Sequence, residues 1–169
     1  MRAHRDVAVA RRRIGIYAKT LGRFVDEVAL AVGENDDRPR AVVTAVLRWC
    51  DGKRATNGTY FDVIDAELWV PRWVRKGRID VESMTDDERA TLDNDPWPQL
   101  WRAVSLLLKG AARAKRGDDY GWGPIAEACG AAVSKLHGDS RKARAAARHR
   151  AYGEFRRALE VLKSEKQAA

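Results

Sequence analysis

Apolar residues recur at alternating spacings of three and four from Val7 to Val32, which predicts one long amphipathic helix. Gly15 and Gly22 fall on one side of this helix, where they either let another helix approach closely or mark a kink. The side away from the apolar residues carries a ridge of bases: Arg5, Arg12, Lys19 and Arg23. The pattern predicts a core helix with a basic outer face, in preference to an intermolecular coiled coil.

Further apolar segments of helical period follow, each bounded by start and stop residues. The expected helix starts are Asp36 or Asp37 with Pro39, Thr59, the capping box Thr85–Glu88, Asp95–Pro98, Pro124, and Asp139 or Ser140. The chain shows no strand pattern of useful length and no internal repeat. It is therefore predicted to be a single all-α domain over residues 1–169, a compact bundle of five to seven helices with a long N-terminal amphipathic helix.

The distribution of charge along the chain predicts, in addition to the helical bundle, that the protein has a polyanionic partner. The net charge is +8, and residues 80–95 hold seven acids and one base, so the rest of the chain carries +14. Such a balance favours nucleic acid first and an anionic membrane surface second. The sequence has neither a signal-peptide apolar region nor an apolar run that would span a membrane. We expect a cytoplasmic protein without a membrane partner.

Catalytic motifs are absent from the sequence: it has no H-E-x-x-H, C-x-x-C, Walker loop or G-x-S-x-G. Cys50 and Cys129 lie in apolar helical patterns and are interpreted as buried free thiols. Asp62 and Asp65 share a helix face, where solvated carboxylates are commoner than a metal or nuclease site. We therefore expect no enzyme activity, catalytic residue, cofactor or metal.

Bases gather in three clusters that predict binding to phosphates, because the planar guanidinium of arginine donates two hydrogen bonds at once. The candidate nucleic-acid-binding residues are Arg5, Arg12 and Lys19; Arg72, Arg75, Lys76 and Arg78; and Arg141, Lys142, Arg144 and Arg148. Trp69 and Trp73 flank the second cluster and either stack on unpaired bases or belong to the core, with the core favoured for Trp73.

The last predicted helix has an apolar stripe of Tyr152, Phe155 and Leu159, which continues backwards as arginines: Arg148, Arg144 and Arg141. Residues 140–153 contain no acid. Unpaired bases beside apolar surface are costly, so these arginines are predicted to meet water, a polyanion or a distant acid. The candidate acids are Asp86, Asp87 and Glu88, in the same chain or in a neighbouring copy.

Residues 125–136, with the sequence IAEACGAAVSKL, resemble the helix-turn-helix of bacterial repressors. The resemblance implies that Gly130 makes the turn and that Ser134, Lys135 and His137 face the major groove of a DNA duplex. Gly138 would end such a recognition helix early. A single helix over Ile125–Leu136 satisfies the same apolar positions and is preferred; the alternative function is a DNA-binding regulator of bacterial or phage type.

In size, helicity and charge the chain resembles the small helical subunits of multi-subunit CRISPR effector complexes. The resemblance implies a non-catalytic subunit of a ribonucleoprotein assembly, with copies side by side along a nucleic-acid strand. The expected partners are RNA or single-stranded DNA, in preference to duplex, together with other subunits, copies of itself among them. Residues 80–95 would then meet a neighbour's basic face. A second alternative is a helical interaction or structural protein that binds no nucleic acid.

Overall fold

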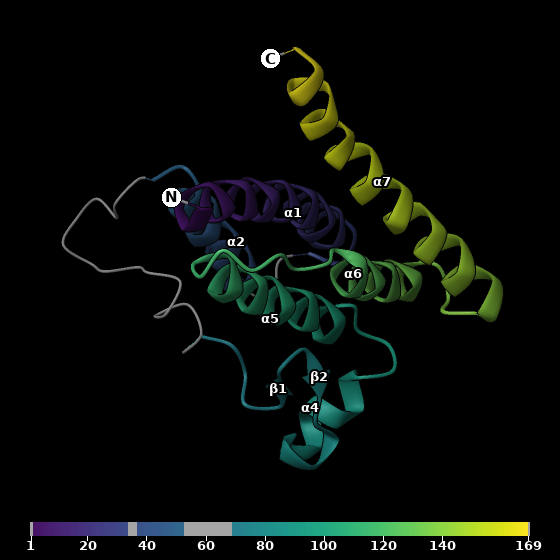
Figure 1. The fold of residues 1–169 in the computed structure, drawn as a ribbon. Helices are drawn as coiled ribbons and strands as arrows, with labels where there is room; N and C mark the ends of the chain where they lie inside the picture. Colours follow the sequence, from purple (N-terminus) through teal and green to yellow (C-terminus); the bar gives the residue numbers. More distant parts are fainter. Residues whose placement is uncertain (1, 34–36, 53–68, 169) are drawn as a thin grey trace.

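The computed structural model describes residues 2–33, 37–52 and 69–168, with side chains over 7–33, 37–52 and 69–163. These residues form an all-α fold, which confirms the predicted class (Figure 1). The helix predicted from Thr59, with Asp62 and Asp65, lies outside the described residues. The elements are α1 (Arg2–Val32), α2 (Arg38–Cys50), β1 (Val74–Arg75), β2 (Arg78–Ile79), the 3-10 turn η1 (Val81–Ser83), α4 (Asp86–Thr91), α5 (Trp97–Ala114), α6 (Gly123–Leu136) and α7 (Arg141–Ala168).

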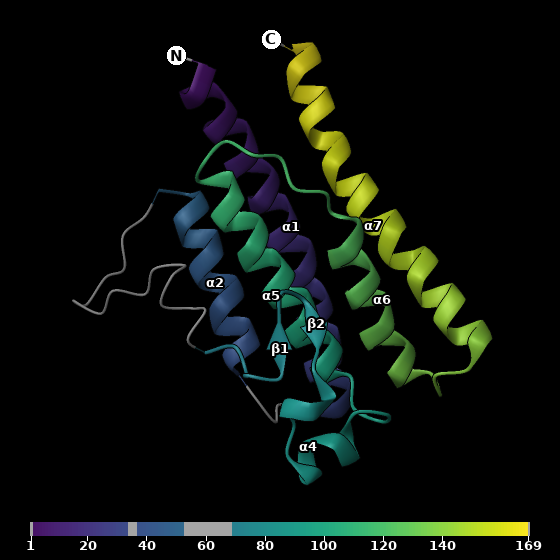
Figure 2. The same ribbon diagram turned by 60° about the horizontal axis from the view of Figure 1, so that its bottom comes forward.

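The five longer helices pack side by side as a bundle. Figure 2 shows α1 and α6 running in one direction and α2, α5 and α7 in the other. Helix α1 touches each of the other four, α5 lies against α1, α2 and α6, and α7 covers α6 and part of α1. The β1–β2 hairpin packs on α5, so α5 stands between the hairpin and α1.

Helix α1 runs without a break through both of its glycines. A Cβ atom at Gly15 would lie 3.5 Å from the Cβ of Cys50, and one at Gly22 would lie 3.4 Å from Cγ1 of Val43. Both glycines therefore face α2, where a Cβ would make ordinary van der Waals contact. The predicted apolar side is confirmed as core, with exposed fractions of 2% or less at Ile14, Tyr17, Leu21, Phe24 and Val28.

Most of the predicted helix starts are confirmed. The Thr85 hydroxyl accepts from the Glu88 N–H at 3.2 Å while the Thr85 N–H donates to the Glu88 carboxylate at 2.9 Å, which completes the capping box of α4. The Ser140 hydroxyl accepts from the Ala143 N–H at 3.1 Å and caps α7. Asp37 precedes α2 but makes no side-chain cap bond.

The small hairpin is an element that the sequence pattern did not predict. Lys76 and Gly77 have φ angles of 51° and 76°, as a two-residue turn with left-handed backbone requires, and Val74 pairs with Ile79 across it. A Cβ at Gly77 would collide with the Leu106 side chain of α5. Each strand has only two residues, which is too short for the alternation of apolar and polar residues that marks a strand in the sequence.

The register predicted for α7 is wrong over its first half. The buried positions there are Ala147, Ala151 and Phe155, whereas Arg144 and Arg148 are exposed. A Cβ on Gly130 of α6 would lie 2.8 Å from the Cα of Arg148, so the two helix backbones nearly touch at this point. Only small residues fit such a contact. The packing stripe therefore consists of alanines, which carry almost no hydrophobic signal beside the arginines.

Gly130→Ala is expected to lower the free energy of unfolding by up to about 2 kcal/mol. The new methyl group meets the backbone of α7, which cannot rotate away, and overpacking of this kind costs about 1–3 kcal/mol. The gain of alanine over glycine inside a helix, roughly 1 kcal/mol, offsets only part of that cost. Urea denaturation measures the difference.

Gly15→Ala is the matched control, because its Cβ would make only an ordinary 3.5 Å contact with Cys50. That variant is expected to be as stable as the natural chain or more stable, by up to about 1 kcal/mol. Equal unfolding midpoints for the two alanine variants would contradict the close packing of α6 on α7.

Candidate nucleic-acid interface

An open groove with a volume of about 640 Å³ lies between α5 and the segment that leads into the hairpin. Its described lining contains six bases and no acid. The basic residues are Arg72, Arg75, Lys76, Lys109, Arg113 and Arg116. The remaining lining residues are Val70, Pro71, Val74, Ser105, Leu108 and Ala112. The groove is therefore a concave surface with positive walls and a partly apolar floor.

One wall of the groove is the outer face of α5. Lys109 and Arg113 are spaced i and i+4, so they lie on one side of the helix, opposite its fully buried residues Leu107 and Ala111. Arg116 follows in the turn just after the end of α5 and lines the same wall. The sequence analysis did not single out these bases, because they fall outside the three predicted clusters. The four-residue spacing of Lys109 and Arg113 is the signal that could have indicated a separate basic face.

The other wall carries three of the predicted binding residues: Arg72, Arg75 and Lys76. Trp73 and Val74 alternate with them and are buried, with exposed fractions of 7% and 4%, so they fix this segment against the core. The interpretation of Trp73 as a core residue is confirmed. Trp69 is different, because 39% of it is exposed. Arg78, also predicted, is exposed on β2 but does not line the groove.

The bases of the groove have no salt-bridge partner among the described residues, although the pKa of Asp80 is lowered chiefly by a hydrogen bond from Ser83 and also by the charge of Arg75. The Arg113 guanidinium lies 5.4 Å from the centre of the Tyr120 ring. Bases elsewhere in the fold do have acid partners: Arg150 donates to both carboxylate oxygens of Glu27, at 3.0 and 2.5 Å. A concave surface with one sign of charge concentrates anions.

The arginines of α7 form a second, separate basic surface. Arg141 and Arg148 are exposed, and the Arg148 guanidinium lies 5.4 Å from the centre of the Tyr152 ring. Arg144 lies 3.8 Å from Asp139, an acid just before the acid-free stretch 140–153. The predicted intrachain pairing with residues 86–88 is not found among the described residues, because Glu88 is held in the capping box and Asp86 lies near Arg89.

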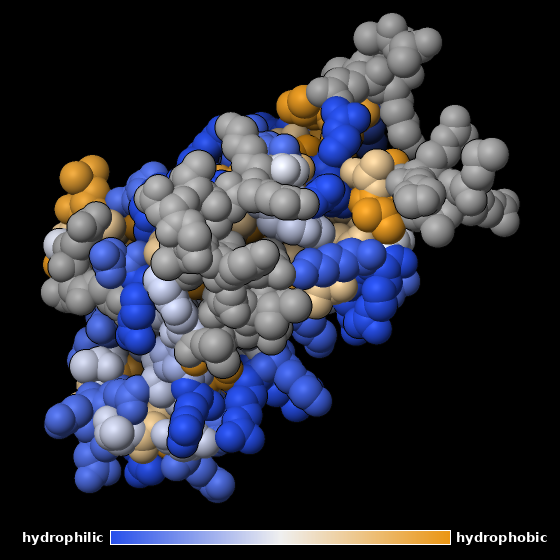
Figure 3. Space-filling model, turned by 90° about the vertical axis from the view of Figure 1, so that its left-hand side faces the viewer, coloured by the Kyte–Doolittle hydropathy of each residue, from blue (hydrophilic) through white to orange (hydrophobic). Residues whose placement is uncertain are grey.

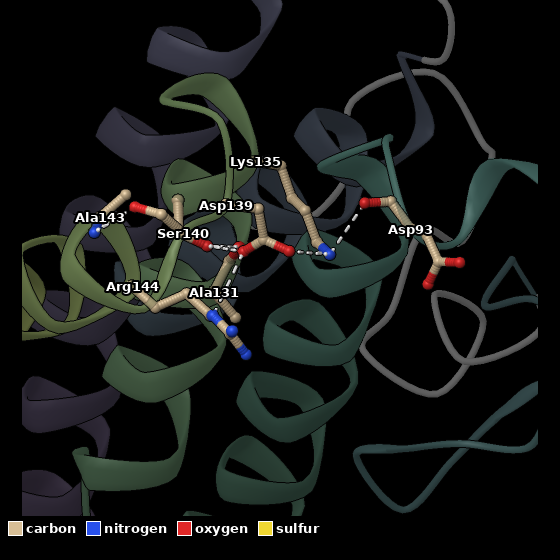
Figure 4. A network of polar contacts seen from close by, with 8 residues as sticks. Asp93, Ala131, Lys135, Asp139, Ser140, Ala143 and Arg144 are labelled. Carbon is tan, nitrogen blue, oxygen red and sulfur yellow. Dashed lines mark hydrogen bonds and ion pairs between the residues drawn. The ribbon is translucent and has the colours of Figure 1, made fainter.

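Asp139 is the centre of a polar network at the corner between α6 and α7 (Figure 4). Its carboxylate accepts from the Lys135 ammonium at 2.6 Å and from the Ser134 hydroxyl at 2.8 Å, while Lys135 also donates to the Asp93 carbonyl at 3.0 Å. The hydrogen bond from Lys135, chiefly, holds the pKa of Asp139 below its usual value. Three segments are joined here, so Lys135 has a structural role.

Residues 125–136, whose sequence resembles a helix-turn-helix, lie within one helix of the structure. Helix α6 is continuous from Gly123 to Leu136, so Gly130 lies inside a helix and makes no turn. Ser134 is fully buried, Lys135 is engaged in the Asp139 network, and only His137 of the three expected contact residues is exposed. The preferred single helix is confirmed.

The basic ridge of α1 lies on a third side of the molecule. Arg12 and Lys19 are exposed, on the opposite side of α1 from Ile14, which meets α5 at Gly110. The side chain of Arg5 lies outside the described residues, and Lys142 is exposed at the start of α7. Of the three predicted basic clusters, only the one at Arg72–Lys76 is joined in the structure by further bases, those at the C-terminal end of α5. The clusters on α1 and α7 lie on separate surfaces.

The cysteines are poorly placed for nucleophilic chemistry. Burial raises the pKa of the Cys50 thiol to about 12 and raises that of Cys129 as well, whereas a reactive cysteine needs a lowered pKa. Cys129 is fully buried as predicted, but Cys50 is only partly buried. Across the described ranges, no set of three or more His, Cys, Asp or Glu residues is arranged to hold a metal ion.

The surface shown in Figure 3 is mainly hydrophilic where the structure describes it, with hydrophobic residues in small separate patches. No helix among the described residues is both long and apolar enough to span a bilayer. Comparison with known protein families, with curated proteins and with solved structures finds no match for the chain. The groove between α5 and the hairpin segment is therefore the feature on which a functional assignment depends.

Proposed function

We propose that the protein is a non-catalytic nucleic-acid-binding protein whose groove holds the phosphate backbone. The observation that carries this proposal is the lining of the groove, with six bases, no acid and no salt bridge among the described residues. Four of the six are arginines, which suit phosphate oxygens because their fork donates two hydrogen bonds.

The concave shape of the site favours a chain-like polyanion over a flat one. Bases on two facing walls surround a strand that runs between them, whereas a membrane surface would reach only the rims. Lys109 is partly buried, Arg113 is exposed one turn further along α5, and Arg116 is exposed just after the helix ends. A flexible backbone entering the groove would meet all three, together with the bases of the opposite wall.

The assignment extends to a subunit of a ribonucleoprotein assembly. The segment from η1 through α4 is exposed and acidic at Glu82, Asp86 and Asp87, and Asp93 just after α4 is exposed as well. Figure 1 shows this segment at the lower end of the molecule, away from α1. An acidic end and basic faces on one chain are suited to contacts with basic neighbours and with a nucleic acid at the same time.

Fluorescence anisotropy with a labelled single-stranded RNA, and with DNA of the same sequence, tests the proposal. Binding is expected to weaken as salt rises from about 50 to 200 mM, with a linear relation between the logarithms of affinity and salt concentration. The protein would not be a nucleic-acid-binding protein if neither strand bound at the lowest salt. Co-purification from the native host, with nuclease treatment and mass spectrometry, would then identify other partners.

A further inference from the structure

We propose that the groove takes a single unpaired strand, with a base of that strand stacked on Trp69, and that it does not seat a duplex. This inference rests on the proposed function and names its ligand more narrowly. It is based on the size of the groove, the distribution of its charges and the apolar surface between them.

The size of the groove matches one strand. Its volume of about 640 Å³ lies in the range of about 300–1,000 Å³ that encloses a small organic ligand. A duplex would have to place two backbones, separated by grooves about 6 and 12 Å wide, on this one surface. It would touch only the rims and would leave the lower part of the groove empty.

Bases on both walls also favour one strand. Lys109, Arg113 and Arg116 face the groove from α5, and Arg72, Arg75 and Lys76 face it from the hairpin side. A backbone that lies between the walls is within reach of both sets. A duplex seated on the rim of the groove would bring phosphates to the bases of one wall only. The bases of the other wall would then have no phosphate to bind.

Apolar residues between the bases fit the faces of nucleobases. Val70, Pro71 and Ala112 line the groove and are only partly buried, so part of their surface is open to a ligand. Phosphate binding alone does not require such surface. In duplex nucleic acid the base faces are stacked inside, whereas an unpaired strand can present them to a protein.

Trp69 is the aromatic residue next to this surface in the chain. It does not line the groove itself but directly precedes Val70, which does, and 39% of it is exposed, while the nearby Trp73 is 7% exposed and belongs to the core. Aromatic side chains are the groups on which unpaired bases stack. Trp69 therefore offers more ring surface to a base than Trp73 does.

The test compares the natural chain with Trp69→Ala and Trp69→Phe on four probes: a single-stranded RNA, the same sequence as DNA, its duplex, and an abasic single strand. The natural chain is expected to bind both base-bearing single strands at least tenfold more tightly than the duplex. Trp69→Ala is expected to lose about 5- to 150-fold in affinity for the base-bearing strands, the range that removal of one stacking partner produces. Affinity for the abasic strand is expected to stay the same.

Trp69→Phe should restore most of the affinity, because its ring also stacks. Leu30→Ala is the control, since Leu30 is an exposed apolar residue of α1, 90% exposed and far along the chain from the groove. Equal or tighter binding of the duplex, or an unchanged affinity in Trp69→Ala, would overturn the inference while leaving nucleic-acid binding intact. Binding to none of the four probes would overturn both.

Discussion

Replacing Lys109, Arg113 and Arg116 together by alanine is expected to weaken binding to single-stranded RNA about 100-fold at 0.1 M salt. Each phosphate contact on a single strand contributes about 0.7 to the slope of log affinity against log salt, so three contacts contribute about 2. The triple variant should therefore also show a slope that is shallower by about 2. Arg113 and Arg116 are exposed and Lys109 is partly buried, so circular dichroism should be unchanged. Loss of the Arg113 contact with the Tyr120 ring should lower the free energy of unfolding by no more than about 1 kcal/mol.

The triple variant Arg141→Ala, Arg144→Ala, Arg148→Ala is the matched control, because it removes the same charge from α7. From the sequence alone, these arginines were expected to make the phosphate contacts. In the structure they lie on the other side of α6, away from the groove, and Arg144 has an acid partner. A slope that falls by about 2 in the α7 variant and stays constant in the α5 variant would place the strand on α7.

Phe155→Ala is expected to lower the free energy of unfolding by about 3–5 kcal/mol, the usual cost of truncating a buried phenylalanine. Phe155 is fully buried, and its ring centre lies 6.4 Å from those of Tyr17 and Phe24 and 6.1 Å from that of Trp122. It therefore joins α7 to α1 and to the start of α6, and no other large side chain of α7 is fully buried among those described.

Urea denaturation followed by far-ultraviolet circular dichroism measures this loss. Val161→Ala is the control on the same helix, because Val161 is 54% exposed and its truncation should change the free energy of unfolding by less than about 0.5 kcal/mol. If Phe155→Ala and Val161→Ala unfolded at the same urea concentration, α7 would not be packed as described.

The sequence was a good guide where local signals and burial agree. The apolar side of α1 is core at the predicted residues, and the Thr85–Glu88 box forms because its two hydrogen bonds join residues three apart. Such features are set within one or two helical turns. They can be predicted without knowing which helices become neighbours.

The groove could be predicted only in part, because its walls come from distant segments. Arg75 and Arg113 are 38 positions apart, and nothing local shows that the hairpin folds onto α5. The α7 register failed for a related reason. Contact with Gly130 selects Ala147 and Ala151 for burial, and a stripe of alanines is invisible to a method that looks for large apolar side chains. Contacts between segments distant in the sequence thus determine both the walls of the groove and the buried side of α7.

Ultraviolet cross-linking of the natural chain to a single-stranded RNA, with the linked peptides identified by mass spectrometry, tests the central claim most directly. The groove predicts that the linked peptides come from residues 69–76 and 105–116, and that Trp69 is among the linked residues. Cross-links confined to residues 141–150 of α7 or to the outer face of α1 would contradict it.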